Sequence, residues 1–222
     1  MNKFKMTIII MLIITIISIS KVYAHINSYN LLGKSVYIDP GHGGRDSGAV
    51  YKNIYEKDIN LIISKKLEQS LVAKGMEVYL TRETDIDLST TTKNKKRSDL
   101  TNRAKIINNS NVDMYISIHS NYINSSKWQG LQIFYTNKNQ ENKNIAESIT
   151  SSLKETSNNI REAKEENSYY MYKQITKPGI LIELGFLSNP NDRYRLTKEE
   201  HQNLLVENIS NAIEKYLLND KT

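Results

Sequence analysis

The residues in this sequence that could do chemistry together are two histidines, His42 and His119, and two glutamates, Glu56 and Glu183. Two imidazoles and one carboxylate form a ligand set that holds Zn²⁺ and leaves one coordination position for water, whose pKa the ion lowers towards about 7. Glu183 lies in the apolar run LIELGF, where an acid needs a partner. Such a setting suits a group that takes a proton from water and returns it to a leaving amine.

Each candidate also has a purely structural interpretation. His42 could be a turn residue bonded to backbone, His119 could be a strand-end histidine, and Glu56 could be a first-turn carboxylate favoured by the helix dipole. The two remaining histidines are poorer candidates. His25 would become the first residue after signal cleavage, and His201 stands among polar neighbours.

A cluster of glycines surrounds His42 in the segment YIDPGHGGRDSG. Four of the nine glycines of the chain fall in this segment: Gly41, Gly43, Gly44 and Gly48. Glycine allows a sharp turn and a close approach of other groups, so the cluster would aim His42 inward and keep bulky neighbours away from a metal and a substrate. A phosphate-binding loop is the weaker interpretation, because no G-K-[ST] follows and the spacing is not G-x-G-x-x-G.

The elements that must position these residues alternate between strands and helices. Short apolar or β-branched runs predict strands at residues 35–38, 77–81, 114–118, 131–135 and 179–182. Helical spacing of apolar residues predicts helices at residues 56–74, 99–109 and 139–155. Thr197 and Glu200 predict a capping box for a last helix. This alternation indicates one α/β domain with a mainly parallel, twisted sheet flanked by helices.

The predicted strands bring ionisable side chains to one edge of the sheet. In parallel sheets, ligands gather outside the carboxyl ends of the strands. Residues that follow those ends, or begin the first helix at the same edge, are His42, Glu56, Arg82, His119 and Glu183. We therefore predict the active site at this edge, with Arg82 and Asn121 as substrate-binding residues, because an arginine there could pair with an anionic group.

The N-terminus has the pattern of an export signal. Lys3 and Lys5 precede an apolar stretch over residues 6–19, and the small residues Val22 and Ala24 follow. A spanning helix needs about 20 apolar residues, so the pattern predicts a signal peptide over residues 1–24 and a catalytic domain over residues 25–222. Lys21 lies close to the predicted cut, which leaves an uncleaved anchor as the alternative. Both interpretations predict export across the cytoplasmic membrane.

The charge balance narrows the classes of partner. The formal net charge is +6, and removal of residues 1–24 would leave about +3. The basic cluster of Lys93, Lys95, Lys96 and Arg97 is typical of a solvated loop, and it could instead contact an anionic polymer. Nucleic acid is not expected as a partner, because aromatic residues do not interleave with the basic ones. The chain has no cysteine, which excludes disulfides, thiol catalysis and a cysteine metal site.

Four sequence blocks resemble a known family. The blocks are VYIDPGHGGRDSGAV, YEKDINL, YISIHSN and GILIELGFLSNPND, and the segments VYLTRETD and LTNRAKIINNSNVD lie between them. Together they resemble the zinc-dependent N-acetylmuramoyl-L-alanine amidases over about residues 34–217. The resemblance implies that His42, Glu56 and His119 bind Zn²⁺ and that Glu183 is the catalytic glutamate. It also implies cleavage of the amide between the lactyl group of N-acetylmuramic acid and L-alanine.

Within that family, the chain most resembles the germination-specific sporulation amidases of the CwlD type. We find no cell-wall-binding repeat and no regulatory helical insert, as in that subgroup. The resemblance implies a peptidoglycan substrate in the spore cortex, a role in muramic-δ-lactam formation, and an accessory or activating protein as a partner. It implies a place in the cell wall or in the intermembrane space of the developing spore, with membrane contact only through an uncleaved N-terminal segment.

Other functions compete with this one. A vegetative autolysin of the same family and an exported zinc peptidase of peptidoglycan would use the same ligand set. A non-catalytic wall-binding module would need a broken ligand set or a missing Glu183, and the sequence has neither. Two histidines and a carboxylate also suit Fe²⁺ in an oxygenase, but Glu183 has no evident task in that chemistry.

Overall fold

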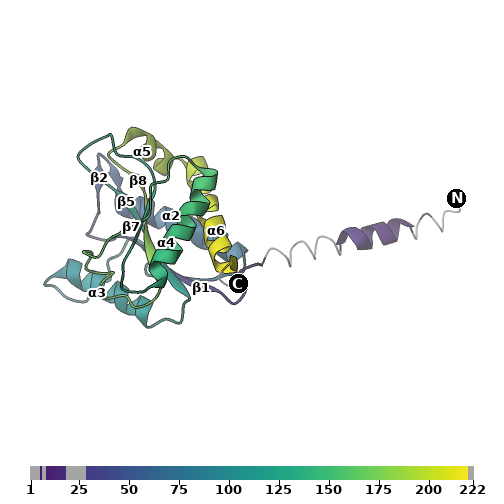
Figure 1. Ribbon diagram of the computed structural model, residues 1–222, viewed down its shortest axis with the longest axis horizontal. Helices are drawn as coiled ribbons and strands as arrows, with labels where there is room; N and C mark the ends of the chain where they lie inside the picture. Colours follow the sequence, from purple (N-terminus) through teal and green to yellow (C-terminus); the bar gives the residue numbers. More distant parts are fainter. Residues whose placement is uncertain (1–5, 7–8, 19–28, 220–222) are drawn as a thin grey trace.

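A computed structural model describes residue 6, residues 9–18 and residues 29–219. Its centre is a six-stranded sheet with the strand order β4-β1-β5-β8-β6-β7 (Figure 1). The strands are β1 (Ser35–Pro40), β4 (Glu77–Leu80), β5 (Met114–Asn121), β6 (Gln132–Tyr135), β7 (Lys164–Glu165) and β8 (Gly179–Phe186). β4, β1, β5 and β8 are parallel, whereas β6 runs antiparallel to β8 and pairs in parallel with β7. The predicted mainly parallel sheet is confirmed.

Helices cover both faces of this sheet. Helices α2 (Glu56–Ala73), α4 (Glu141–Thr156) and α6 (Glu199–Asn219) pack on one face, and α3 (Lys95–Asn108) lies on the other (Figure 1). Two shorter features complete the domain: the hairpin of β2 (Val50–Tyr51) with β3 (Ile54–Tyr55), and helix α5 (Pro190–Thr197) after β8. The predicted α/β architecture with flanking helices is confirmed.

Strand alternation divides the interior into two hydrophobic cores. On β5, Ile116 and Ile118 belong to the larger core beneath α2, α4 and α6, whereas Tyr115 belongs to the smaller core beneath α3. Successive side chains of a strand point to opposite faces, so residues two apart share a face. His119 therefore lies on the α3 face, together with Tyr115. By the same alternation, Glu183 of β8 lies on that face.

Several predicted boundaries are wrong for physical reasons. β5 and β8 continue past their apolar runs to Asn121 and Phe186, because they pair with each other beyond residue 118. His119 and Glu183 therefore lie within strands, not after them. The predicted capping box is also wrong: Thr197 ends α5 and its hydroxyl donates to the backbone oxygen of Arg193.

The N-terminal predictions lie mostly outside the described residues. Residues 9–18 are helical, and their isoleucine and leucine side chains are exposed. The cleavage predicted after Ala24 falls on a residue that the structure does not describe, so the boundary at 24/25 stays a prediction. Among the described residues, no helix combines the length and the apolar character that a membrane crossing requires.

Candidate metal centre and active site

β5 and β8 place His119 and Glu183 side by side. The two residues are register partners in the parallel ladder, and both lie on the α3 face of the sheet. The ladder is irregular directly after His119, where Asn121 pairs with Phe186. The register thus shifts directly after the two functional side chains, at the carboxyl edge that the sequence predicts.

The glycine-rich turn brings His42 to the same edge. His42 follows β1 and adopts a left-handed backbone with φ of 62°, a conformation uncommon for a residue other than glycine. A Cβ atom on Gly41 would lie 2.3 Å from the His119 ring, and one on Gly48 would lie 2.5 Å from the Glu56 carboxylate. Glycine at these two positions lets the backbone approach the other candidate ligands closely, as predicted.

Glu56 links the two histidines from the first turn of α2. Its Oε1 atom lies 3.1 Å from Nε2 of His42 and 3.0 Å from Nδ1 of His119. The backbone N–H groups of Ala49 and Ser120 donate to the same carboxylate at 2.7 and 3.1 Å. One ligand atom from each of the three side chains lies within 4.8 Å of the other two. Such a compact set of two imidazole nitrogens and a carboxylate oxygen fits a divalent transition-metal ion.

The electrostatics of the set also suit a cation. Burial disfavours the charged form of His42, but its contacts with Asp46 and Glu56 outweigh this and raise its pKa to about 9. Burial likewise opposes ionisation of Glu56, yet both histidines hold its pKa well below the usual range. Asp46 accepts from Nδ1 of His42 at 3.0 Å, which leaves Nε2 facing Glu56. Outer carboxylates of this kind orient metal-ligating histidines in many metal sites.

Glu183 differs from the other carboxylates of the site. Its side chain is buried, as that of Glu56 is, but its Oε2 atom has no hydrogen-bond partner among the described residues. Burial, and then the negative charge of Glu56, raise its pKa to about 8, although His42 acts in the opposite direction. A carboxyl group with this pKa can exchange a proton near neutral pH, which is what acid–base catalysis requires.

These residues line a single cavity of about 390 Å³. His42, Glu56, His119 and Glu183 all contribute to its wall, and so does Asn121. The substrate-binding role of Asn121 stays a prediction. Sequence reasoning missed several other lining residues, among them Asp46, Tyr122, Tyr169, Tyr170 and Tyr172, and Lys96 of the basic cluster also lines the cavity. The run SYYMY over residues 168–172 was the available signal, because three tyrosines stand out in an otherwise polar stretch.

The predicted role of Arg82 is wrong. Its side chain is 2% exposed and does not line the cavity. The guanidinium donates to the backbone oxygens of Pro40, Gly41, Lys57 and Thr84 at 2.8–3.1 Å. Four of its five N–H donors are thus used inside the protein, so Arg82 holds the glycine-rich turn in place, and its side chain lies outside the cavity.

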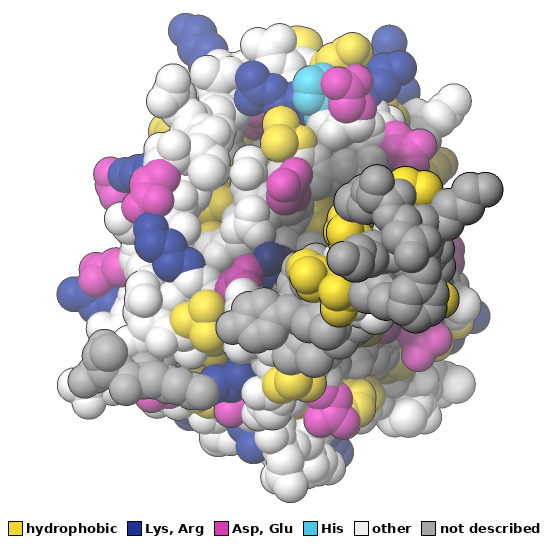
Figure 2. Space-filling model, turned by 90° about the vertical axis from the view of Figure 1, so that its right-hand side faces the viewer, with side chains coloured by type: hydrophobic (Ala, Val, Ile, Leu, Met, Phe, Trp, Pro, Cys, Tyr) yellow, Lys and Arg dark blue, Asp and Glu magenta, His cyan; other side chains and the backbone are white. Residues whose placement is uncertain are grey.

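The basic cluster lies beside the site, not on a free loop. Lys95, Lys96 and Arg97 form the first turn of α3, and Lys96 pairs with Asp46 at 3.3 Å while its side chain stays 68% exposed. On the face shown in Figure 2, the basic and acidic side chains of the described residues are interspersed. The interpretation of the cluster as a contact with an anionic polymer stays a prediction.

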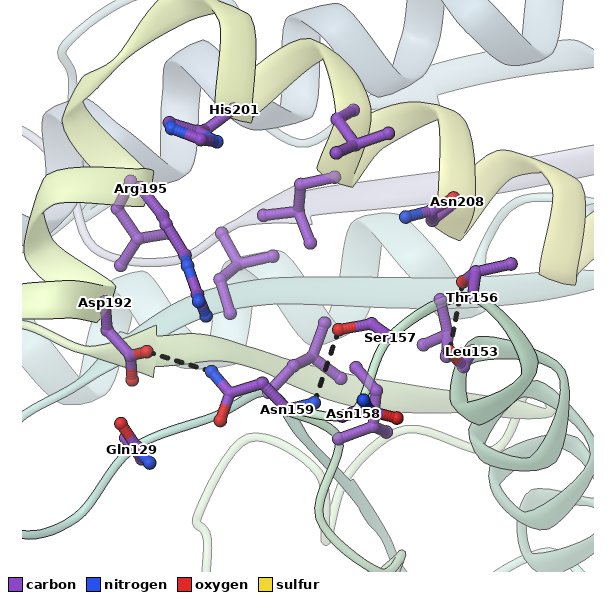
Figure 3. A pocket seen from close by; sticks show the side chains of 16 residues that line it. Gln129, Leu153, Thr156, Ser157, Asn158, Asn159, Asp192, Arg195, His201 and Asn208 are labelled. Atoms are coloured by element: carbon purple, nitrogen blue, oxygen red, sulfur yellow. Dashed lines mark hydrogen bonds between the residues drawn. The ribbon is translucent and has the colours of Figure 1, made fainter.

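A larger cavity, of about 640 Å³, lies away from this chemistry. Residues of α4, α5 and α6 line it, and Asp192 bonds Asn159 across its floor (Figure 3). His201 is the one histidine in its wall, and none of the predicted site residues reaches it. Asp192 also accepts from the backbone N–H groups of Gly130 and Phe186, which marks it as a structural carboxylate. The smaller cavity is therefore the candidate active site.

Comparisons with known proteins show which family this chain resembles. The chain is 42% identical over 194 residues to the germination-specific N-acetylmuramoyl-L-alanine amidase of Bacillus subtilis, covering 85% of this chain and 82% of that protein. It is 30% identical to the probable cell wall amidase LytH of Staphylococcus saprophyticus, covering 86% of this chain and 60% of the relative.

A solved structure is similar to this chain in fold and sequence. The CwlD amidase from Clostridioides difficile, in complex with the GerS lipoprotein, matches with a TM-score of 0.76 and 39% identity, over 83% of this chain and 98% of that one. The family model of N-acetylmuramoyl-L-alanine amidases, Amidase_3, matches residues 36–215. The chain therefore belongs to this family and is a cell-wall N-acetylmuramoyl-L-alanine amidase.

Proposed function

We propose that this amidase is a zinc enzyme in which His42, Glu56 and His119 hold the ion and Glu183 is the catalytic acid–base. The observation that carries the proposal is the set of three ligand atoms within 4.8 Å of one another, in the same cavity as a buried glutamate. The absence of cysteine and the two imidazole donors favour a site of the catalytic His₂Glu kind over a structural site.

The proposed metal ion, Glu183 and Asn121 each have a separate role in the reaction. Zn²⁺ in a three-ligand site of this kind polarises a carbonyl oxygen and lowers the pKa of water to about 7. Glu183 accepts a proton from the attacking water and returns it to the leaving nitrogen of L-alanine. A cation at the neighbouring ligands favours the ionised form of Glu183 that this first transfer needs. Asn121, in the wall of the same cavity, contacts the substrate.

The bond that we propose for cleavage is the amide between the lactyl group of N-acetylmuramic acid and L-alanine. The test is mass spectrometry of products after residues 25–222 and Zn²⁺ are added to purified peptidoglycan. Released stem peptides with free L-alanine N-termini and intact glycan strands are expected. Cleavage within the peptide would point to the rival zinc peptidase, and new reducing ends would reject an amidase altogether.

We further propose that the substrate is the peptidoglycan of the spore cortex and that the product leads to muramic-δ-lactam. The similarity to a germination-specific amidase supports this role. A deletion strain is expected to make spores that lack the lactam and germinate poorly. Normal lactam in that strain would favour a vegetative role, which the similarity to a probable cell wall amidase also allows.

Export and an accessory partner complete the proposal. We propose that residues 1–24 direct export and are removed, and N-terminal sequencing of the exported protein should then begin at His25. A sequence that begins at Met1 would indicate the uncleaved anchor. The solved complex of the CwlD amidase with a lipoprotein supports an accessory protein in the same compartment, which co-purification from sporulating cells would test.

A further inference from the structure

A chain of hydrogen bonds connects His119 to a buried ion pair. Nε2 of His119 lies 3.4 Å from the hydroxyl of Tyr172, which donates to Oγ of Ser117 at 2.9 Å. Ser117 in turn donates to Oδ2 of Asp39 at 2.7 Å. The other carboxylate oxygen of Asp39 pairs with Arg103 at 2.8 Å, and both side chains are 1% exposed. This series of hydrogen bonds thus begins at His119, a proposed zinc ligand, and ends at the buried ion pair of Asp39 and Arg103.

The chemistry of its end point fixes the direction of every bond. An ionised carboxylate only accepts hydrogen bonds. Burial opposes ionisation of Asp39, but Arg103, together with the hydroxyls of Thr81 and Ser117, lowers its pKa below the ordinary value. The single proton of the Ser117 hydroxyl therefore points to Asp39, and Ser117 accepts the proton of Tyr172. The tyrosine oxygen is then left as an acceptor, and Nε2–H of His119 is the donor that faces it.

We infer that Tyr172 is a positioning residue that keeps the proton of His119 on Nε2 and turns the Nδ1 lone pair toward Glu56 and the proposed metal. The inference rests on the proposed function, because it assigns a task toward the zinc ion. A neutral imidazole has one N–H and one lone pair, so a proton fixed at Nε2 leaves Nδ1 as the ligand atom. For His42 the arrangement is reversed, because Asp46 accepts from Nδ1 and Nε2 faces Glu56.

The same ion pair also supports the other histidine. Arg103 donates to the backbone oxygens of His42 and Pro40 at 2.6 and 2.8 Å. It pairs with Asp99 of its own helix as well, at 2.8 Å. Both proposed histidine ligands are therefore tied to one buried guanidinium, His42 through its backbone and His119 through Tyr172, Ser117 and Asp39.

The test is Tyr172→Phe, which keeps the ring and removes only the hydroxyl. Zinc affinity, measured by competition with a chromogenic chelator, is expected to fall about 10–100-fold, as for the loss of other outer partners of ligand histidines. Tyr115→Phe is the matched control. Tyr115 is equally buried and stacks on Tyr172 with ring centroids 6.3 Å apart, but it contacts neither histidine through a hydrogen bond. Its loss should leave zinc affinity unchanged.

A second variant tests the direction of the chain. Ser117→Ala leaves the Tyr172 hydroxyl in place but removes its acceptor, so its proton can turn toward Nε2 of His119. Zinc affinity should fall in this variant as well, and the double variant should be no weaker than the worse single variant, because both break one chain. Thermal unfolding without metal shows that each variant is folded before its affinity is compared.

The outcomes separate this inference from the proposed function. Wild-type zinc affinity in folded Tyr172→Phe, or an equal loss in Tyr115→Phe, would overturn the positioning role and leave the zinc proposal intact. Failure of the wild-type protein to bind zinc would overturn the proposed function. The direction of these hydrogen bonds would still be decided by ¹⁵N NMR of the His119 ring: a proton on Nε2 supports it, and an Nε2 atom without a proton overturns it.

Discussion

Replacing Glu183 by glutamine should make this protein inactive and at the same time more stable. Glu183 lines the active-site cavity, and its Oε2 atom has no hydrogen-bond partner among the described residues. Glutamine keeps the shape of the side chain but cannot take up a proton near neutral pH. Turnover is therefore expected to fall by about 10²–10⁴-fold, the usual loss when a general acid–base is removed.

The gain in stability follows from the raised pKa. The group has an ordinary pKa of 4.5 and a value of about 8 in the folded protein. Folding at pH 7 must therefore protonate a carboxylate that is ionised in the unfolded chain. At about 1.36 kcal/mol per pH unit, the interval from 4.5 to 7 costs about 3 kcal/mol. Since the buried amide of glutamine also lacks a partner, we expect a gain of about 1–3 kcal/mol in the free energy of unfolding.

The sign of the pH dependence gives the sharpest assay. The folded state holds the Glu183 proton more tightly than the unfolded state, so the wild-type protein loses stability as the pH rises from 4.5 to 8. Glu183→Gln lacks this loss, and its advantage should be near zero at pH 4.5 and largest at pH 8. Urea unfolding in the presence of a chelator measures it, because a bound cation would favour the carboxylate.

Glu207→Gln provides the matched control, since Glu207 lies exposed on α6 and loses the same charge. It should change neither turnover nor the pH dependence of unfolding. A Glu183→Gln variant with turnover within about tenfold of wild type would refute the catalytic assignment. A variant whose stability relative to wild type is the same at pH 5 and pH 8 would refute the buried, protonated state.

Three further perturbations test other parts of the site. His42→Ala should abolish stoichiometric zinc in elemental analysis while His201→Ala retains it, and the reverse result would move the metal site to the larger cavity. Gly48→Ala should lower stability by about 1–3 kcal/mol and weaken zinc binding, because its φ of 63° and the contact of its Cβ with Glu56 both disfavour a side chain. Arg82→Ala should lower the urea midpoint by the equivalent of about 3 kcal/mol or more, since four backbone carbonyls lose their donor. A raised KM at unchanged stability would restore the substrate-binding role.

Long elements could be predicted from the sequence because their apolar spacing is strong. Helix α2 begins and ends within a residue of its predicted bounds, and Ile59, Ile63 and Leu67 are buried along one face. Short elements were not predicted, although the sequence around the start of α5 contains a recognisable helix-start pattern. The side chain of Asn189 accepts from two backbone N–H groups of that helix, and Pro190 occupies its first position. The hairpin β2–β3 has two residues per strand, too few for any period to show.

The candidate site was predictable as a set of positions but not as a set of contacts. Strand order brings His42, His119 and Glu183 to one edge, and this follows from the α/β pattern alone. Arg82 was placed at the correct edge with the wrong task, because sequence does not tell where a long side chain turns. Tyr172 was missed for a related reason: it belongs to an irregular segment, and only the folded chain brings it to His119.

The two faces of the sheet explain how this domain stays stable although its active site buries polar residues. One face of β1, β5 and β8 packs Val36, Ile116 and Ile182 into the larger hydrophobic core. The opposite face carries the partly buried His119 and also Asp39, Ser117 and Glu183, whose burial costs free energy even when they are paired. Because side chains alternate along each strand, the same strands supply both sets. Changes to Val36, Ile116 or Ile182 should therefore act on stability alone, whereas changes on the α3 face should alter metal affinity, proton transfer and stability together.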